Sequence, residues 1–147
     1  YVDSDLGGIS TDNAALLRFD PLTGKCAPLK TTVDTTARTI TAQLNHLSLF
    51  QVSALIPAAT LDNARIFPNP FYVSRSPQVT FYQMPASARV RVFTLRGALV
   101  FEQEAGTSGL VTWSGKNQGG RSVASGVYLV MIESGNFKKI LKLAVIR

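Results

Sequence analysis

The sequence predicts an all-β protein built from two units. Almost every segment alternates apolar and polar residues with a period of two, and Gly, Pro, Asn or Ser bounds these segments, a pattern typical of half-buried strands. The composition, 46% hydrophobic and only 16% charged, excludes intrinsic disorder, which needs low hydrophobicity and high charge. No segment has a convincing helical period. Seven strand candidates in the second unit match the strand count of an antiparallel, immunoglobulin-like (Ig-like) β-sandwich.

Residues 1–57 form the smaller β-rich module. A strand is expected at 15–19, and the Pro and Gly of the following segment, 20–24, predict a tight turn. Further strands are expected at 38–44, which is rich in β-branched residues, and at 47–54, which is apolar on both faces and so a candidate buried strand. Because so few strands enclose a thin core, we interpret this module as the end of a larger β domain or as a unit that leans on the next one. Whether it folds without partner strands stays open.

Residues 58–64 are expected to link the two units, because they lack alternation and Pro57 holds the preceding residue extended. The sandwich then occupies residues 65–147. Its last two strands are joined by Ser-Gly-Asn at 134–136, residues that suit a hairpin turn. Its strands are expected at 65–67, 78–82, 88–95, 99–104, 110–113, 126–133 and 137–146.

Alternation also predicts which side chains face the core of the sandwich. Val90 and Val92 share one face of their strand, and Arg89 and Arg91 share the other, which we interpret as a solvated outer face. Trp113 is expected to fill the space between the two sheets, where large rings most often lie.

The last strand interleaves Lys138, Lys139 and Lys142 with apolar residues. Lysines on a terminal strand usually keep an exposed edge from pairing with other chains. The same edge could instead be a docking surface, and both interpretations stay open.

The net charge of +6 is unevenly distributed: residues 1–57 carry four basic and five acidic side chains, whereas residues 62–147 carry eleven basic and four acidic ones. The second unit should therefore prefer anionic partners. Nucleic acid is not expected, because the basic residues lack interleaved stacking aromatics.

The single cysteine, Cys26, cannot form an internal disulfide, and a single histidine adds no structural zinc site. The chain opens without Met or an apolar leader, so we expect it to be part of a longer protein.

Four stretches follow one another in the second unit: Phe-Pro-Asn-Pro-Phe at 67–71, a strand–turn–strand at 90–100, a Gly-rich stretch at 111–128 that contains the single Trp, and the basic, apolar strand at 138–147. In this order they resemble the C-terminal sorting domain of proteins exported by the type IX secretion system of Bacteroidota and their relatives. The third stretch also resembles the Ig-like domain of the flagellar hook-cap protein. The residues that carry the resemblance are Pro68, Asn69, Pro70, Gly97, Trp113, Gly126, Tyr128, Lys138, Lys142 and Arg147.

The resemblance implies a non-catalytic delivery label rather than an enzyme, with no cofactor. Such domains are recognised by secretion proteins at the outer membrane and are often cleaved and replaced by a lipopolysaccharide anchor. The resemblance therefore implies a secreted protein at the cell surface of a Gram-negative bacterium. The hook-cap likeness implies the alternative, a structural Ig-like module in an extracellular assembly, and leaves self-association open.

Several of these residues have a physical role that the sequence itself predicts. Two prolines around Asn69 favour an extended lead-in, and Gly97 and Gly126 are expected where a turn excludes a Cβ. The ring of Tyr128 suits the core, and its hydroxyl needs a hydrogen-bond partner. The family often has aspartates where this sequence has Ser114 and Asn117, so we expect no metal in that turn.

The segment Asn-His-Leu-Ser-Leu-Phe at 45–50 resembles the autoproteolysis site of adhesion-receptor GAIN domains. On a strand, His46 and Ser48 face the same side, so the histidine could deprotonate Ser48 for attack on the Leu47 carbonyl. The alternative is that the segment simply ends a β domain, with His46 hydrogen-bonded. The chain lacks the paired cysteines typical of the receptor site, and self-cleavage needs a strained peptide bond. We therefore expect the Leu47–Ser48 bond to be intact.

Overall fold

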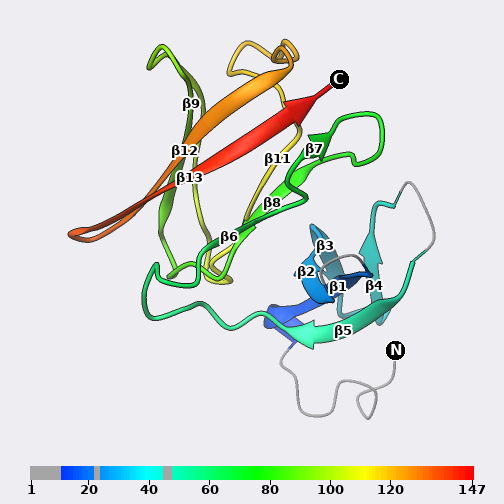
Figure 1. The fold of residues 1–147 in the computed structure, drawn as a ribbon. Helices are drawn as coiled ribbons and strands as arrows, with labels where there is room; N and C mark the ends of the chain where they lie inside the picture. Colours follow the sequence, from blue (N-terminus) through cyan, green and yellow to red (C-terminus); the bar gives the residue numbers. More distant parts are fainter. Residues whose placement is uncertain (1–10, 22–23, 45–47) are drawn as a thin grey trace. The chain divides into compact units, whose positions relative to one another are not determined.

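The computed structural model describes residues 11–21, 24–44 and 48–147. It confirms the predicted all-β class: apart from one short 3-10 turn, η2 (Thr11–Asn13), the described elements are strands in mainly antiparallel sheets. The chain divides into two compact units, residues 1–56 and 57–147 (Figure 1). Within the described part of the chain, no helix has the length and apolar character required to span a membrane.

The first unit contains a three-stranded sheet, with strand order β2-β1-β5, and a β3–β4 hairpin. At the predicted turn after β1, of which residues 22 and 23 lie outside the described residues, the Gly24 N–H donates to the Asp20 carbonyl at 2.8 Å. Among the residues of this unit that the structure describes, the buried apolar side chains are alanines, whereas Leu49 is 71% exposed. This thin core agrees with the expectation from the strand count. The strands are β1 (Ala14–Asp20), β2 (Lys25–Pro28), β3 (Thr31–Asp34), β4 (Thr39–Ala42) and β5 (Phe50–Ala54).

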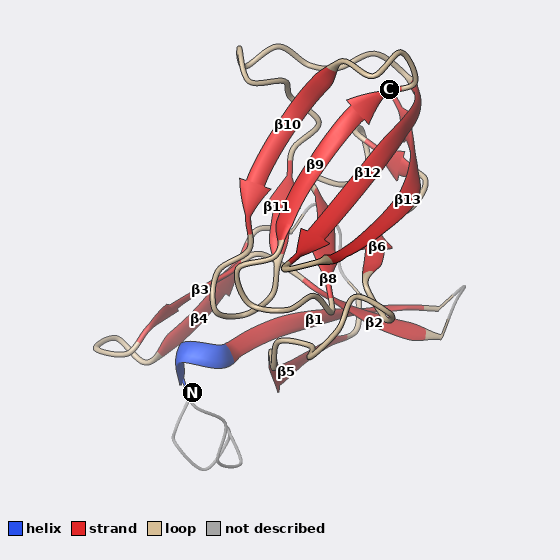
Figure 2. Ribbon diagram, turned by 90° about the vertical axis from the view of Figure 1, so that its left-hand side faces the viewer, coloured by secondary structure: helices blue, strands red, loops and turns tan. Residues whose placement is uncertain are grey.

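The second unit is a sandwich of two sheets. A five-stranded sheet has the order β10-β9-β12-β13-β7, and a three-stranded sheet has the order β11-β8-β6; Figure 2 shows β10, β9, β12 and β13 side by side. Every pairing is antiparallel except β13 with β7, which is parallel. The strands are β6 (Arg65–Phe67), β7 (Phe71–Tyr72), β8 (Val79–Tyr82), β9 (Arg89–Thr94), β10 (Leu99–Glu104), β11 (Val111–Trp113), β12 (Gly126–Ser134) and β13 (Phe137–Ile146).

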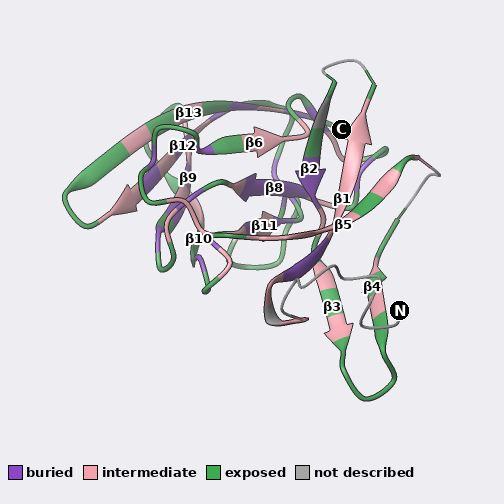
Figure 3. Cartoon of the chain, turned by 90° about the horizontal axis from the view of Figure 1, so that it is seen from below, coloured by how far each residue is buried: buried purple, intermediate pink, exposed green. Residues whose placement is uncertain are grey.

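The hydrophobic core lies between these two sheets. Val90 and Val92 are fully buried, as the alternation predicts, while Arg89 is exposed and Arg91 is half-buried on the opposite face of β9. Strand β8 is buried along most of its length, because it is the central strand of the smaller sheet (Figure 3).

The segment expected as a linker, 58–64, belongs to the second unit instead. Leu61 and Ala64 are 5% and 2% exposed and lie in the core cluster. The Ala58 N–H donates to the Met84 carbonyl at 3.0 Å, and the Lys139 Nζ donates to the Leu61 carbonyl at 3.0 Å. Leu61 and Ala64 pack in the core although their segment shows no regular alternation, so periodicity could not predict their burial.

Three strands, β2, β3 and β7, were not predicted, and β5 is shorter than expected. Strand β7 has only two residues, too few for an alternation pattern. Strand β5 begins at Phe50 and is mostly half-buried, so the expectation of a buried strand at 47–54 is wrong.

Candidate functional site: the last strand and the residues that hold it

The candidate site is strand β13 with the side chains that hydrogen-bond to it. The strand pairs with β12 along the whole length of β12. Leu143 and Val145 point into the core and are at most 1% exposed. Lys138 and Lys142 are exposed and alternate with these residues, so β13 supplies both part of the core and a basic outer face.

Asn69 clamps β13 at its outer edge. Its Nδ2 donates to the Lys142 carbonyl at 2.8 Å, and its Oδ1 accepts from the Ala144 N–H at 3.1 Å. The side-chain amide therefore takes the place of one peptide group of a neighbouring strand. The flanking Pro68 and Pro70 both follow cis peptide bonds.

The end of β13 is held by two further contacts. Phe71, directly after the clamp, is fully buried, and the Val73 N–H donates to the Ile146 carbonyl at 3.0 Å. The Arg147 N–H donates to the Ser125 Oγ at 3.0 Å. Ser125 was missed by the sequence reasoning, although it directly precedes Gly126 in the stretch that carries the family resemblance.

Trp113 and Tyr128 lie inside the sandwich, and Tyr128 belongs to β12, the strand that pairs with β13. The Trp113 ring is 2% exposed and lies 5.7 Å from the Phe101 ring and 6.1 Å, edge-on, from the Tyr128 ring. The Trp113 Nε1 donates to the Lys116 carbonyl at 2.6 Å, and the Tyr128 hydroxyl donates to the Ala124 carbonyl at 2.8 Å. The predicted position of Trp113 and the predicted partner for the Tyr128 hydroxyl are therefore both present.

The turn between Trp113 and Tyr128 is stabilised by an amide. The Asn117 Oδ1 accepts the N–H groups of Gly119 and Arg121, both at 3.0 Å. An asparagine oxygen thus satisfies two turn donors at the position where the resembling family often has an aspartate.

Gly97 closes the turn after β9 with a positive φ, as expected, and the constraint there is conformational rather than steric. A Cβ at Gly97 or Gly126 would meet no atom within 4 Å, so space does not exclude it. Gly97 is required because its φ of +84° is a conformation that other residues adopt only at a cost. Among the described glycines, Gly109 is one at which a Cβ would overlap backbone atoms, and the sequence reasoning missed it because it lies in an ordinary-looking loop.

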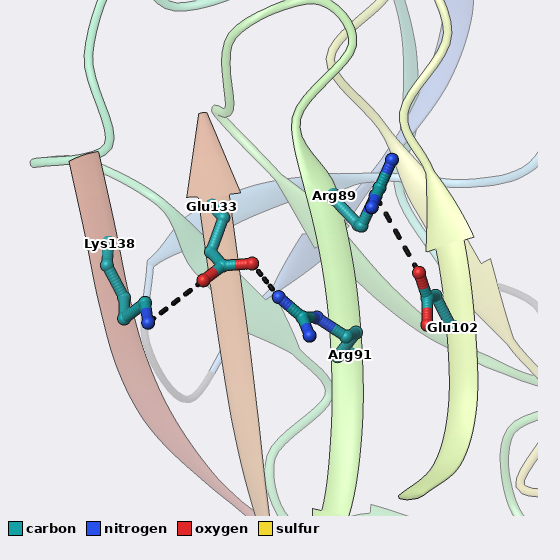
Figure 4. Close-up of polar contacts among 5 residues, drawn as sticks. All are labelled: Arg89, Arg91, Glu102, Glu133 and Lys138. Atoms are coloured by element: carbon teal, nitrogen blue, oxygen red, sulfur yellow. Dashed lines mark hydrogen bonds and ion pairs between the residues drawn. The ribbon is translucent and has the colours of Figure 1, made fainter. Parts of the chain in front are cut away.

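A row of charged side chains crosses the outer face of the five-stranded sheet (Figure 4). The Glu133 carboxylate of β12 forms ion pairs with Arg91 of β9 and with Lys138 of β13, and the Lys138 Nζ lies 3.0 Å from the Glu133 Oε1. Arg89 of β9 lies 3.7 Å from Glu102 of β10. The outer face that the alternation predicts is therefore solvated, and its arginines form ion pairs with neighbouring glutamates.

The segment at 45–50 that resembles an autoproteolysis site is only partly described, so the expectation of an intact Leu47–Ser48 bond falls partly outside the described residues. His46 and Leu47 lie outside the described residues. The Ser48 Oγ donates to the Phe19 carbonyl at 3.3 Å, a contact that joins the segment before β5 to the end of β1.

We expect Asn69→Ala to lower the free energy of unfolding by about 1–2 kcal/mol, because it removes both hydrogen bonds of the clamp and each is worth about 0.5–1.5 kcal/mol. Urea unfolding followed by circular dichroism measures the change. The control is Asn63→Ala, at an exposed asparagine. An equal change in both variants would contradict a clamping role.

Burial raises the pKa of Tyr128 above its ordinary value. The unfolded chain therefore ionises first as pH rises past about 10, and native stability falls in that range. We expect Tyr128→Phe to lose about 0.5–1.5 kcal/mol at neutral pH, where the hydrogen bond to Ala124 is intact. The variant should lack the part of the alkaline decline that Tyr128 causes. Urea unfolding of both proteins at neutral and alkaline pH tests this, and identical pH profiles would contradict it.

Fold and site together define an all-β chain of two units. The second unit is a sandwich whose last strand is held by backbone pairing and by side-chain hydrogen bonds. No family model matches the chain, and no curated protein matches it. Among solved structures it is similar to PorZ from Porphyromonas gingivalis, described as an essential bacterial surface component of the type IX secretion system, with a TM-score of 0.55 and 24% identity over 89% of this chain. It also aligns with dimeric latent PorU from the same organism, with a TM-score of 0.41 and 22% identity over 56% of this chain and 9% of PorU. The matched region spans 22% of the PorZ chain, and the likeness shows a shared fold.

Proposed function

We propose that this chain is a non-catalytic sorting and surface-attachment region of a larger exported bacterial protein, recognised by the type IX secretion machinery at the outer membrane. The observation that carries the proposal is the convergence of the resembling stretches on β13: Asn69 binds its backbone, and Ser125 binds the residue that follows it. The fold likeness to PorZ, a surface component of that secretion system, supports it.

The proposed partners are secretion proteins of the outer membrane and anionic lipopolysaccharide. Support comes from the exposed basic residues Lys138, Lys142 and Arg147, since exposed positive charge attracts anionic partners. The corresponding location is the outer surface of a Gram-negative cell. We propose no catalytic role, and the polar groups of Asn69, Asn117, Ser125 and Tyr128 are used in structural hydrogen bonds.

The second candidate is a structural module of an extracellular assembly that associates with itself. The observation that favours it is the exposure of apolar side chains on the outer face of the larger sheet: Val127 and Ile140 are 44% and 60% exposed. Apolar side chains left exposed on a sheet face are available for association with another surface.

The test is export of a periplasmic reporter fused to the N-terminus of the whole chain, in a bacterium with a working type IX system. We expect the reporter outside the cell, and we expect deletion of residues 138–147 to retain it in the periplasm. The second unit alone, starting at Pro57, should suffice because it has its own core. Export that is unaffected by the deletion would overturn the proposal and favour the structural module.

Because the deletion also removes buried Leu143 and Val145, a second variant keeps the fold. Lys138→Glu with Lys142→Glu reverses the basic face of β13, and the control reverses two exposed charges elsewhere, Lys116→Glu with Arg121→Glu. We expect weaker export only in the first pair. Equal export of both pairs would exclude recognition through this face.

A further inference from the structure

The outer edge of β13 is only partly covered. On one side β13 pairs with β12, and on the other β7 pairs only with Val145 and Ile146. The Asn69 amide covers the Lys142 carbonyl and the Ala144 N–H. From Lys138 to Ile140, no described strand pairs with this edge.

The register shows which backbone groups are available there. In an antiparallel ladder, alternate residues direct their N–H and C=O groups to opposite neighbours. Lys142 and Ala144 direct theirs away from β12, toward Asn69, so Lys138 and Ile140 direct theirs to the same outer edge. These groups are a template for one more strand.

The side chains at this edge restrict what can pair with it. Lys138, Ile140 and Lys142 lie on the outer face, in the order basic, apolar, basic, and Ile140 is 60% exposed. Lys142 makes no ion pair within the described part of the chain, whereas the Lys138 Nζ lies 3.0 Å from a Glu133 carboxylate oxygen and would be shared with a partner's carboxylate. Opposite charges directly across two strands stabilise their pairing, and like charges destabilise it.

A second copy of this chain fits poorly. A symmetric dimer would pair the two β13 edges antiparallel, and a pairing centred on Ile140 would place Lys138 of each copy opposite Lys142 of the other. The lysines thus prevent self-pairing, as the sequence pattern suggests, yet the same two charges attract an acidic strand.

We propose that this edge binds an extended acidic segment of another protein by strand addition, with carboxylates facing Lys138 and Lys142 and an apolar side chain facing Ile140. The proposal rests on the proposed function in that a component of the secretion machinery would supply the segment. Main-chain hydrogen bonds give affinity in such complexes, and alternate side chains give specificity.

The probe is a fluorescein-labelled, capped peptide Glu-Thr-Val-Thr-Glu, whose first, third and fifth side chains share one face of a strand. It is titrated with the whole chain and followed by fluorescence anisotropy. Two control peptides carry lysine in place of glutamate, or the same residues in the order Glu-Glu-Val-Thr-Thr. We expect saturable binding of the Glu-Thr-Val-Thr-Glu peptide only, weakened by added salt because exposed charges are screened.

The decisive variant is Ile140→Pro, because proline removes an edge N–H and is tolerated where that N–H does not serve the ladder. Its matched control is Ile140→Thr, which keeps the N–H. We expect the proline variant to weaken binding about tenfold and the threonine variant to bind within about threefold of the parent. Lys142→Glu should weaken binding about fivefold, from the loss of an exposed ion pair and its replacement by repulsion, and Lys116→Glu should leave it unchanged.

Absence of saturable binding, or equal binding by the proline and threonine variants when both unfold at similar temperatures, overturns the proposal. A dimer in light scattering that Ile140→Pro abolishes also overturns it, because the occupant is then a second copy. These results are independent of the export assay. Normal export without peptide binding removes only the strand-addition proposal, whereas peptide binding with export insensitive to deletion of 138–147 removes only the proposed function.

Discussion

Replacing Trp113 with alanine is expected to lower the free energy of unfolding by about 3–5 kcal/mol, the usual cost of deleting a buried large aromatic side chain. The ring lies between the two sheets, within 6.1 Å of both the Phe101 and Tyr128 rings. Its removal leaves a cavity that the surrounding strands can fill only in part. The substitution also removes the hydrogen bond, 2.6 Å long, that the Trp113 Nε1 donates to the Lys116 carbonyl.

Circular dichroism during urea unfolding measures this loss without relying on tryptophan fluorescence. The matched control is Phe137→Ala, because Phe137 is also an aromatic residue of the larger sheet but is 69% exposed. We expect the control to change stability by no more than about 0.5 kcal/mol. A loss below 2 kcal/mol, roughly the lower limit for buried large-to-small changes, would show that Trp113 does not hold the sheets together.

Gly109→Ala is expected to lower the free energy of unfolding by about 2–5 kcal/mol, from a left-handed backbone and a steric overlap together. Gly109 has a φ of +63°, and a Cβ there would overlap the Met84 carbonyl oxygen and lie 3.3 Å from the Pro57 Cα. Both neighbours are backbone atoms, so neither can move away by a simple side-chain rotation. The Met84 carbonyl also accepts the hydrogen bond from Ala58.

Gly97→Ala separates the two causes. Gly97 also has positive φ, +84°, but open space around the Cβ position. We expect its substitution to cost only the conformational part, about 1–2 kcal/mol. Thermal unfolding of the two variants side by side gives the comparison, and an equal loss in both would exclude the overlap as a cause.

Much of the second unit could be predicted from local pattern. The burial of Val90 and Val92 and the outward position of Arg89 follow from alternation along a single strand, because a strand exposes alternate side chains to opposite faces. The position of Trp113 follows from the preference of large rings for the space between sheets. Strand β7 and the packing of Leu61 could not be predicted in this way. Two residues are too few to show a period, and Leu61 is buried by elements that lie far away in the sequence.

The sequence by itself determined the all-β class, most strands of the second unit and the stretches that carry the family resemblance, because each depends on residues close together in the chain. Only the tertiary structure decided which contacts those stretches make with one another. Asn69 binds β13 across 73 and 75 residues of chain, and Ser125 reaches Arg147 across 22. Such contacts depend on which strands become neighbours and in which register, and register is set by the packing of the whole sandwich rather than by any one segment.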